Sequence, residues 1–192
     1  MLSMDGLIQD ILQRRAKVDS KNGASETAED YAQVWSTFVN YVKSCMEQKR
    51  GLILNSFCKV GWLTGRGRQT GKSSYKPFFQ FTDQFVRAYL SQEAKRKHDA
   101  PPQGDLCPFE DFNFSKAAIK FSQQLTKDQV FSMLKAIVQR LGEIISEGKE
   151  VDIAMGDVGR LSCRGDRDPR FSFSPDIYAQ EGLDAPHSAA DE

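Results

Sequence analysis

Residues 147–161 have the sequence EGKEVDIAMGDVGRL, and this stretch decides the fold of the second half of the chain. Every second residue from Val151 to Met155 is apolar, which is the pattern of a strand with one buried face. The Gly-Asp-Val-Gly segment at 156–159 predicts a tight turn, and Leu161 begins a second alternating strand. The stretch therefore predicts a pair of antiparallel strands.

The residues around this strand pair predict two helices before it and one strand after it. Thr126 and Gln129 have the spacing of a capping box, and apolar residues then recur at helical spacing over residues 130–145. We expect a shorter helix at about residues 114–124 and a third strand at residues 171–173. The second half thus has the order helix, helix, strand, strand, strand.

The first half repeats this order. The expected elements are helices at residues 7–12 and 31–46, strands at 52–54, 60–62 and 75–79, and a last helix capped by Thr82-Asp83. Before the third strand, residues 65–72 contain three glycines and no apolar residue, so we expect an exposed turn or arm there. The chain therefore has an α+β pattern that occurs twice.

A charged stretch followed by Pro and Gly separates the two patterns. We expect a first domain at residues 1–97, a linker at 98–104 and a second domain at 105–181. Residues 182–192 are small and acidic and contain Pro, so we expect a disordered tail.

The formal net charge of zero conceals opposite charges in the two halves. Residues 1–97 contain 16 Lys and Arg against 9 Asp and Glu, whereas residues 98–192 contain 10 against 17. Between Lys49 and Gln80, seven residues are basic and none is acidic. A local field of this sign attracts nucleic acids or acidic protein surfaces, whatever the net charge is.

The composition leaves little material for catalysis, metal binding or membrane insertion. The chain has 2 His, and the spacing of its 4 Cys fits neither a zinc site nor a disulfide framework, so we expect reduced thiols in the core. The carboxylate pairs Glu110-Asp111 and Asp166 with Asp168 have no neighbouring nucleophile and are interpreted as solvated turn residues. We expect no enzyme, cofactor, small-molecule substrate, metal site, signal peptide or membrane span.

The order of elements resembles that of the HU/IHF class of small architectural proteins. Residues 147–151 and 156–161 are similar to that family's stretch from its second helix through its Gly-containing strand turn, and residues 68–72 resemble its arm tip. The resemblance implies two tandem HU/IHF-like units, each with two helices and a three-stranded antiparallel sheet with an arm, the first with a C-terminal helix as well.

A closer resemblance is to the eukaryotic branch with tandem HU-like units, the coiled-coil domain-containing protein eighty-one family. Residues 34–39, 75–78 and 109–114 carry it. HU proteins bury their apolar helix and sheet faces against a second copy. The resemblance therefore implies that the two units pack as an intramolecular pseudo-dimer, with homodimerisation as the competing outcome.

The basic segment carries the candidate partner-binding residues. These are Lys59, Arg66, Arg68, Lys72 and Lys76. A nucleotide-binding loop is rejected, because position 66 is not Gly and a strand, not a helix, follows. The remaining interpretations are an arm that grips an acidic surface or polyanion, and a solvated hairpin that only maintains solubility.

Two functions remain. HU-type arms bend DNA with a Pro wedge at the arm tip, where this chain has Arg68, and the second arm at residues 164–170 offsets its arginines with two aspartates. The family resemblance implies centrosomes, basal bodies and ciliary axonemes. We therefore expect a structural or adaptor protein of the cytoplasmic microtubule cytoskeleton, with tubulin or other axonemal or centrosomal partners. An architectural DNA-binding protein is the alternative.

Overall fold

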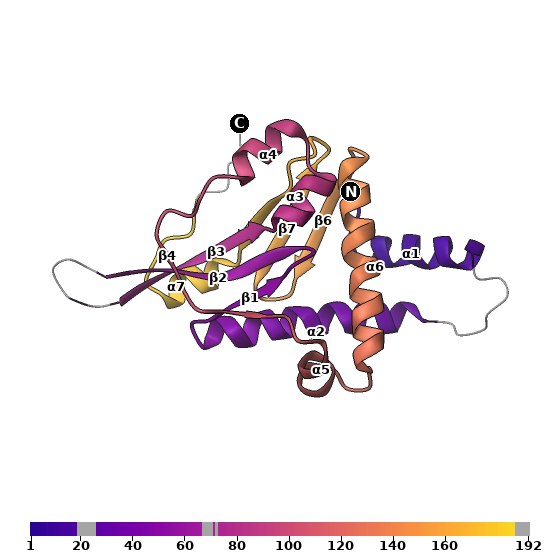
Figure 1. Ribbon diagram of the computed structural model, residues 1–192, viewed down its shortest axis with the longest axis horizontal. Helices are drawn as coiled ribbons and strands as arrows, with labels where there is room; N and C mark the ends of the chain where they lie inside the picture. Colours follow the sequence, from indigo (N-terminus) through magenta and orange to yellow (C-terminus); the bar gives the residue numbers. More distant parts are fainter. Residues whose placement is uncertain (19–25, 67–70, 72, 187–192) are drawn as a thin grey trace.

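A computed structural model describes residues 1–18, 26–66, 71 and 73–186 of the chain (Figure 1). No helix in this described part is both long and apolar enough to cross a bilayer.

The first half begins with two helices, of which the second is the longer. Thr27 caps α2 through a complete capping box with Asp30, in which the Thr27 hydroxyl accepts from the Asp30 N–H and the Asp30 carboxylate accepts from the Thr27 N–H. The elements are α1 (Met4–Val18), α2 (Ala28–Glu47), β1 (Gly51–Leu54), β2 (Cys58–Arg66), β3 (Ser73–Phe81), α3 (Asp83–Tyr89) and α4 (Gln92–His98).

The second half has a long helix with the same kind of start. The predicted capping box of Thr126 and Gln129 is confirmed at the N-terminus of α6. The elements are β4 (Asp105–Leu106), β5 (Phe109–Asp111), α5 (Phe114–Lys116), the π-helix η1 (Ala117–Phe121), α6 (Lys127–Ser146), β6 (Glu150–Met155), β7 (Gly159–Arg164), β8 (Arg170–Phe173) and α7 (Pro175–Gln180).

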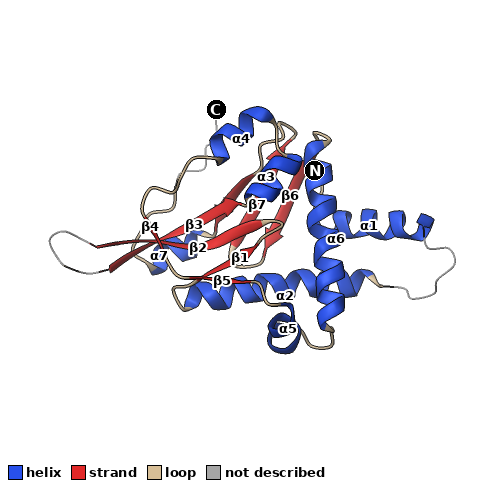
Figure 2. Ribbon diagram, in the orientation of Figure 1, coloured by secondary structure: helices blue, strands red, loops and turns tan. Residues whose placement is uncertain are grey.

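Two sheets are present in the described residues, and helices lie around them (Figure 2). The first sheet has the order β3-β2-β1-β5, with β4 paired to β2, and the second has the order β6-β7-β8. Strands β4 and β5 lie within the predicted second domain, yet they pair with strands of the first sheet. The two halves are therefore joined by strand pairing as well as by the chain itself.

Both halves contribute to one hydrophobic core. Trp35 of α2 is 6% exposed, and its Nε1 donates a hydrogen bond to the Ala154 carbonyl in β6 at 2.9 Å. Phe79 of β3 stacks on Phe171 of β8 with ring centroids 4.3 Å apart. All four cysteines are buried free thiols, as predicted.

The architecture is α+β, as predicted, and most expected elements are present. Helix α2, the β2–β3 hairpin, the Thr82 cap of α3, helix α6 and strands β6–β8 are confirmed. Helices α4 and α7 were not predicted. Phe131, which belongs to the apolar pattern at residues 130–145, is 49% exposed and packs edge-on against Phe114.

Candidate functional site

The β2–β3 hairpin is the candidate arm, and it projects from the body of the protein (Figure 1). Its two nine-residue strands pair in unbroken register from Cys58 opposite Phe81 to Arg66 opposite Ser73. Strands of this length span about 30 Å. Strand β4 pairs with β2 only at Leu63 and Thr64, so within the described residues the outer end of the hairpin has no third strand.

Two of the predicted contact residues share one face of this hairpin. Lys59 lies opposite Gln80, and Lys76 lies opposite Leu63. Because residues alternate between faces along a strand, both lysines lie on the face opposite buried Val60. They are separated by four residues along the ladder, or about 13 Å. Lys76 is exposed and Lys59 is half-buried.

The other three predicted residues lie at or beyond the end of the described strands. Arg66 is the last residue of β2. Arg68 and Lys72 lie outside the described residues. The structure therefore places the candidate residues on one hairpin and brings Lys59 and Lys76 to one face of it.

The base of the hairpin is held by an aromatic and ionic cluster that the sequence did not indicate. Trp62 is 4% exposed, and its Nε1 donates to the Met46 carbonyl at 3.0 Å. Lys49 Nζ lies 4.2 Å from the centroid of the Trp62 ring and 5.4 Å from that of Tyr75. Lys49 also forms an ion pair with Glu181, just after α7. The hairpin is thus attached at its base to the second half.

Burial of Lys49 lowers its pKa, because an ammonium group loses hydration there. Lys49 also borders a cavity of about 440 Å³ between the end of α2, the base of the hairpin and α7. Its lining carries both signs of charge, with Lys43 paired to Asp157 at 3.0 Å. This cavity is part of the junction between the halves and does not continue the basic field of the hairpin.

The β7–β8 hairpin, which occupies the place of the second predicted arm, is short and folded onto the first half. The Ser91 N–H donates to the Arg167 carbonyl at 3.3 Å. Asp168 is 8% exposed and accepts a hydrogen bond from Lys97 Nζ at 2.9 Å, while His98 Nε2 lies 3.0 Å from its other oxygen. The short second arm is confirmed, and its loop contacts the body of the protein.

The interpretation of Asp168 as a solvated turn residue is wrong. Burial by itself would raise its pKa, but the hydrogen bonds and positive charges of Lys97 and His98 hold the pKa below its ordinary value of 3.8. The sequence did not reveal this, because these partners are 70 or more residues away along the chain.

The same interpretation is also wrong for Glu110 of β5. Its carboxylate accepts hydrogen bonds from the Tyr41 hydroxyl at 2.7 Å and from Lys116 Nζ at 3.0 Å. Desolvation opposes ionisation, yet these donors keep the pKa of Glu110 below its ordinary value. For Tyr41, burial and the neighbouring carboxylate raise the pKa. These groups connect α2, β5 and α5, and they have a structural role.

The described residues contain no group of three or more His, Cys, Asp or Glu side chains arranged to hold a metal ion. The site therefore consists of one projecting basic hairpin, anchored at its base and accompanied by a second hairpin that is folded back.

The second half of the chain is similar to a known protein family. Residues 108–180 match the family described as CCDC81 eukaryotic HU domain 2. The match begins directly before β5 and ends at the last residue of α7. A comparison with curated proteins finds no match.

Proposed function

We propose that this chain is a non-enzymatic structural or adaptor protein of the microtubule cytoskeleton. The premise is its family: the match at residues 108–180 makes it an HU-like domain protein of the CCDC81 family. Its place is a ciliary axoneme, a doublet microtubule or a basal body in the cytoplasm. The β2–β3 hairpin contacts acidic surfaces of tubulin or of other axonemal or centrosomal proteins. The proposal requires no cofactor.

The observation that carries this proposal is the asymmetry of the two hairpins. The β2–β3 hairpin extends from the body, and the chain from Lys49 to Gln80 contains seven basic residues and no acidic one. The β7–β8 hairpin is tied down through Asp168. A single basic projection suits attachment to one side of an acidic protein lattice, where attraction between opposite charges steers the encounter.

We also propose that the two halves pack as an intramolecular pseudo-dimer of HU-like units. Contacts between equivalent elements support this arrangement: the long helices α2 and α6 lie against one another, and the edge strands β3 and β8 meet at the Phe79–Phe171 stack. A protein that supplies both units itself has no need of a second copy.

An architectural DNA-binding role is the second candidate, and the HU-family match favours it. Clamping a duplex from two sides needs two free arms, and only one hairpin projects in the described part of this chain. Binding of the basic hairpin to DNA would release counterions from the phosphates, so the affinity for DNA would fall steeply as the salt concentration rises.

Parallel titrations of the full-length protein distinguish the two roles. Stabilised microtubules and nicked duplex DNA are each titrated at near-physiological salt. Retention on microtubules alone supports the proposal, and tight binding to DNA alone overturns it in favour of the second candidate. Binding to neither partner overturns the tubulin contact.

Charge-matched variants test the role of the hairpin. The variant Arg66→Ala/Arg68→Ala/Lys72→Ala removes three positive charges from the arm. The control variant Lys120→Ala/Lys127→Ala/Lys135→Ala removes three from exposed positions on η1 and α6. The arm variant should lose most of the binding at low salt while the control retains it. Equal binding by the two variants contradicts the assignment of the arm.

A further inference from the structure

The two long helices end in the same backbone motif but with different residues at its left-handed position. At the end of α6, the Gly148 N–H donates to the Ile145 carbonyl at 3.0 Å. The Lys149 N–H donates to the Ile144 carbonyl at 3.3 Å. These two bonds form a Schellman motif, whose left-handed position is usually glycine. Gly148, with a φ of +76°, fits this pattern.

Helix α2 ends in this motif with lysine in place of glycine. The Lys49 N–H donates to the Met46 carbonyl at 3.0 Å. The Arg50 N–H donates to the Cys45 carbonyl at 2.9 Å. Lys49 has a φ of +57°, a conformation in which the Cβ of an L-residue crowds its own backbone. Contacts of the Lys49 side chain must therefore offset a cost that glycine would not have.

The Lys49 ammonium group lies against both strands of the hairpin. Trp62 of β2 lies opposite Pro77, two positions from Tyr75 on β3, so the two rings are diagonal neighbours on one face. Their centroids are 6.2 Å apart. Lys49 Nζ lies 4.2 Å from the Trp62 centroid and 5.4 Å from the Tyr75 centroid, within the range of cation–π attraction for both. One cation thus holds the two strands from the same side.

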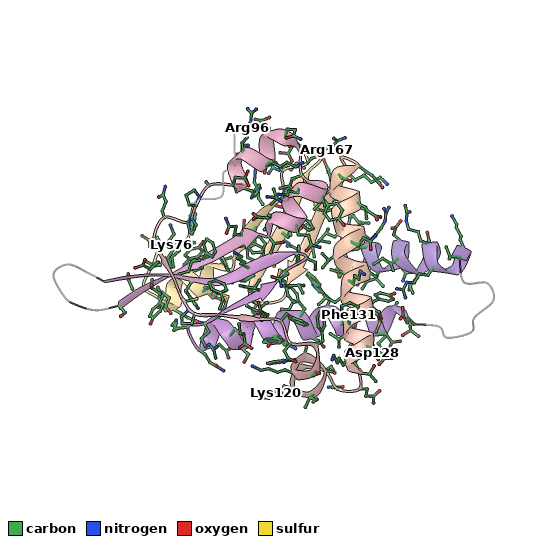
Figure 3. All side chains as sticks on the ribbon, in the orientation of Figure 1. Lys76, Arg96, Lys120, Asp128, Phe131 and Arg167 are labelled. Carbon is green, nitrogen blue, oxygen red and sulfur yellow. The ribbon has the colours of Figure 1, made fainter. Side chains whose placement is uncertain are left out.

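This contact lies where the hairpin leaves the body of the protein. Thr64, the residue opposite Tyr75, is also the outermost residue of β2 that pairs with β4. The next two residue pairs of the hairpin, at 65–74 and 66–73, have no third strand beside them among the described residues. Figure 3 shows Lys76, the neighbour of Tyr75, toward this end of the molecule, whereas Asp128 of α6 lies toward the other. Lys49 is therefore at the base of the projecting segment.

Glu181 joins the same ammonium group to the second half. The Lys49 side chain is 35% exposed and that of Glu181 is 16% exposed, so water and salt screen this ion pair less than they screen a surface pair. Glu181 directly follows α7, whose Tyr178 is buried. Lys49 is thus connected to α2 through its own backbone and to α7 through Glu181.

We propose that Lys49 is a positioning residue for the β2–β3 hairpin, whose ammonium group fixes the direction in which the hairpin projects. The group contacts both strands at the point where β4 ends, and it is itself held by α2 and α7. A hairpin held in one direction loses less conformational freedom on binding than one that swings, so its affinity for a partner is higher. This effect on affinity rests on the proposed function of the arm, whereas the direction of the hairpin does not.

Distances between two spin labels in the full-length protein test the proposal. The labels are attached to Ser73→Cys on β3 and Gln139→Cys on α6, which are exposed positions, while the four native thiols are buried. Pulsed EPR should give a single narrow distance when Lys49 is intact. Lys49→Ala should broaden the distribution, and Lys49→Arg, which keeps the charge, should restore it. A narrow distribution in Lys49→Ala, or a broad one with Lys49 intact, would overturn the proposal.

The variant Lys49→Gly separates positioning from stability. Glycine adopts the left-handed φ without strain, so the urea midpoint of Lys49→Gly should be higher than that of Lys49→Ala. If Lys49 only stabilised the fold, the glycine variant would also have the better ordered hairpin. We expect equally broad distance distributions in the two variants, because both lack the ammonium group. A narrow distribution in Lys49→Gly would overturn the proposal.

The charge-matched control is Lys43→Ala. Lys43 also lies on α2 and pairs with the second half, but its partner Asp157 lies in the β6–β7 turn. This variant removes one positive charge and one ion pair, as Lys49→Ala does, and should keep the narrow distance. Broadening equal to that of Lys49→Ala would overturn the assignment to Lys49.

Binding to stabilised microtubules measures the consequence for the proposed function. Lys49→Ala and Lys49→Gly should bind about fivefold more weakly than the wild type, while Lys43→Ala and Lys49→Arg should bind like it. Wild-type affinity in Lys49→Gly would overturn the link between direction and affinity. If the wild type itself does not bind, the proposed function fails, and the spin-label distances still decide whether Lys49 positions the hairpin.

Discussion

The β2–β3 and β7–β8 hairpins occupy corresponding places in the two halves, but their surroundings differ. The first has nine-residue strands and only basic charges toward its end, and the second has strands of six and four residues and a loop that contains a buried carboxylate. In the second hairpin, Asp168 has two partners in the other half, Lys97 and His98, and the Arg167 carbonyl accepts a hydrogen bond from the Ser91 N–H. Strand length and the contacts of the loop thus distinguish the projecting hairpin from the one that lies against the body.

The largest loss of stability is expected when Trp35, which joins the first half to the second sheet, is removed. Trp35→Ala should lower the free energy of unfolding by about 3–5 kcal/mol, because a buried ring and its hydrogen bond to Ala154 are lost. Trp35→Phe keeps most of the packing and should cost about 1–3 kcal/mol for the unpaired carbonyl. Urea denaturation measures the free energy of unfolding of both variants. Equal decreases for Trp35→Ala and Trp35→Phe would show that the packing of the ring does not contribute.

A smaller loss of stability is expected at Asp168, which joins the loop of the second hairpin to Lys97 and His98 of the first half. Asp168→Ala should lower the free energy of unfolding by about 1–3 kcal/mol, because the buried acceptor for Lys97 and His98 is removed. The matched control is Asp157→Ala, which also removes an ion pair between the halves, with Lys43, but at a site where the aspartate is 84% exposed. The control should leave the urea midpoint unchanged. A midpoint shift in the control equal to that of Asp168→Ala would show that burial does not matter.

The pH dependence of stability tests the contribution of the ionised Asp168 carboxylate. The folded-state pKa of Asp168 is lower than its ordinary value of 3.8, so the folded state binds this proton less readily than the unfolded state does. The resulting stabilisation is complete above the ordinary value and is lost as the pH falls through the lower folded value. Asp168→Asn should therefore weaken the dependence of the urea midpoint on pH between about pH 5 and pH 2. An identical dependence in wild type and variant would contradict this role.

The smallest effect on stability is expected on the projecting hairpin. Lys59→Ala and Lys76→Ala should each change the free energy of unfolding by no more than about 0.5 kcal/mol, because neither lysine forms an ion pair with another described residue. Binding to an acidic partner should nevertheless weaken and become less sensitive to salt, as titrations at two ionic strengths would show. A destabilisation comparable to that of Asp168→Ala would contradict the absence of ion pairs between these lysines and other described residues.

The fold could largely be predicted because its signals are local. The capping box of Thr126 and Gln129 and the alternation from Val151 to Met155 each depend on residues within a few positions of one another. Helix α4 was missed, because its sequence, QEAKRKH, has a single buried residue, Ala94, and resembles a charged linker. Strands β4 and β5 have only two and three residues, which is too short for a periodic pattern.

The candidate site was predicted in part. A run of basic residues without an acid was visible in the sequence, and two of its lysines lie on one face of the hairpin. The contacts of Asp168 with Lys97 and His98 could not be foreseen, because these residues are brought together only by packing between the two halves. Likewise, the ion pair of Lys49 with Glu181 joins positions more than a hundred residues apart.

The shared core has a consequence for how the protein behaves at different concentrations. Trp35 and Ala154 belong to one chain, so their contact forms in a unimolecular step and does not by itself make stability depend on protein concentration. A protein that needed a second copy for this core would dissociate at low copy number. In the proposed pseudo-dimer, each molecule carries its own partner surface, at an effective concentration set by the connecting segment.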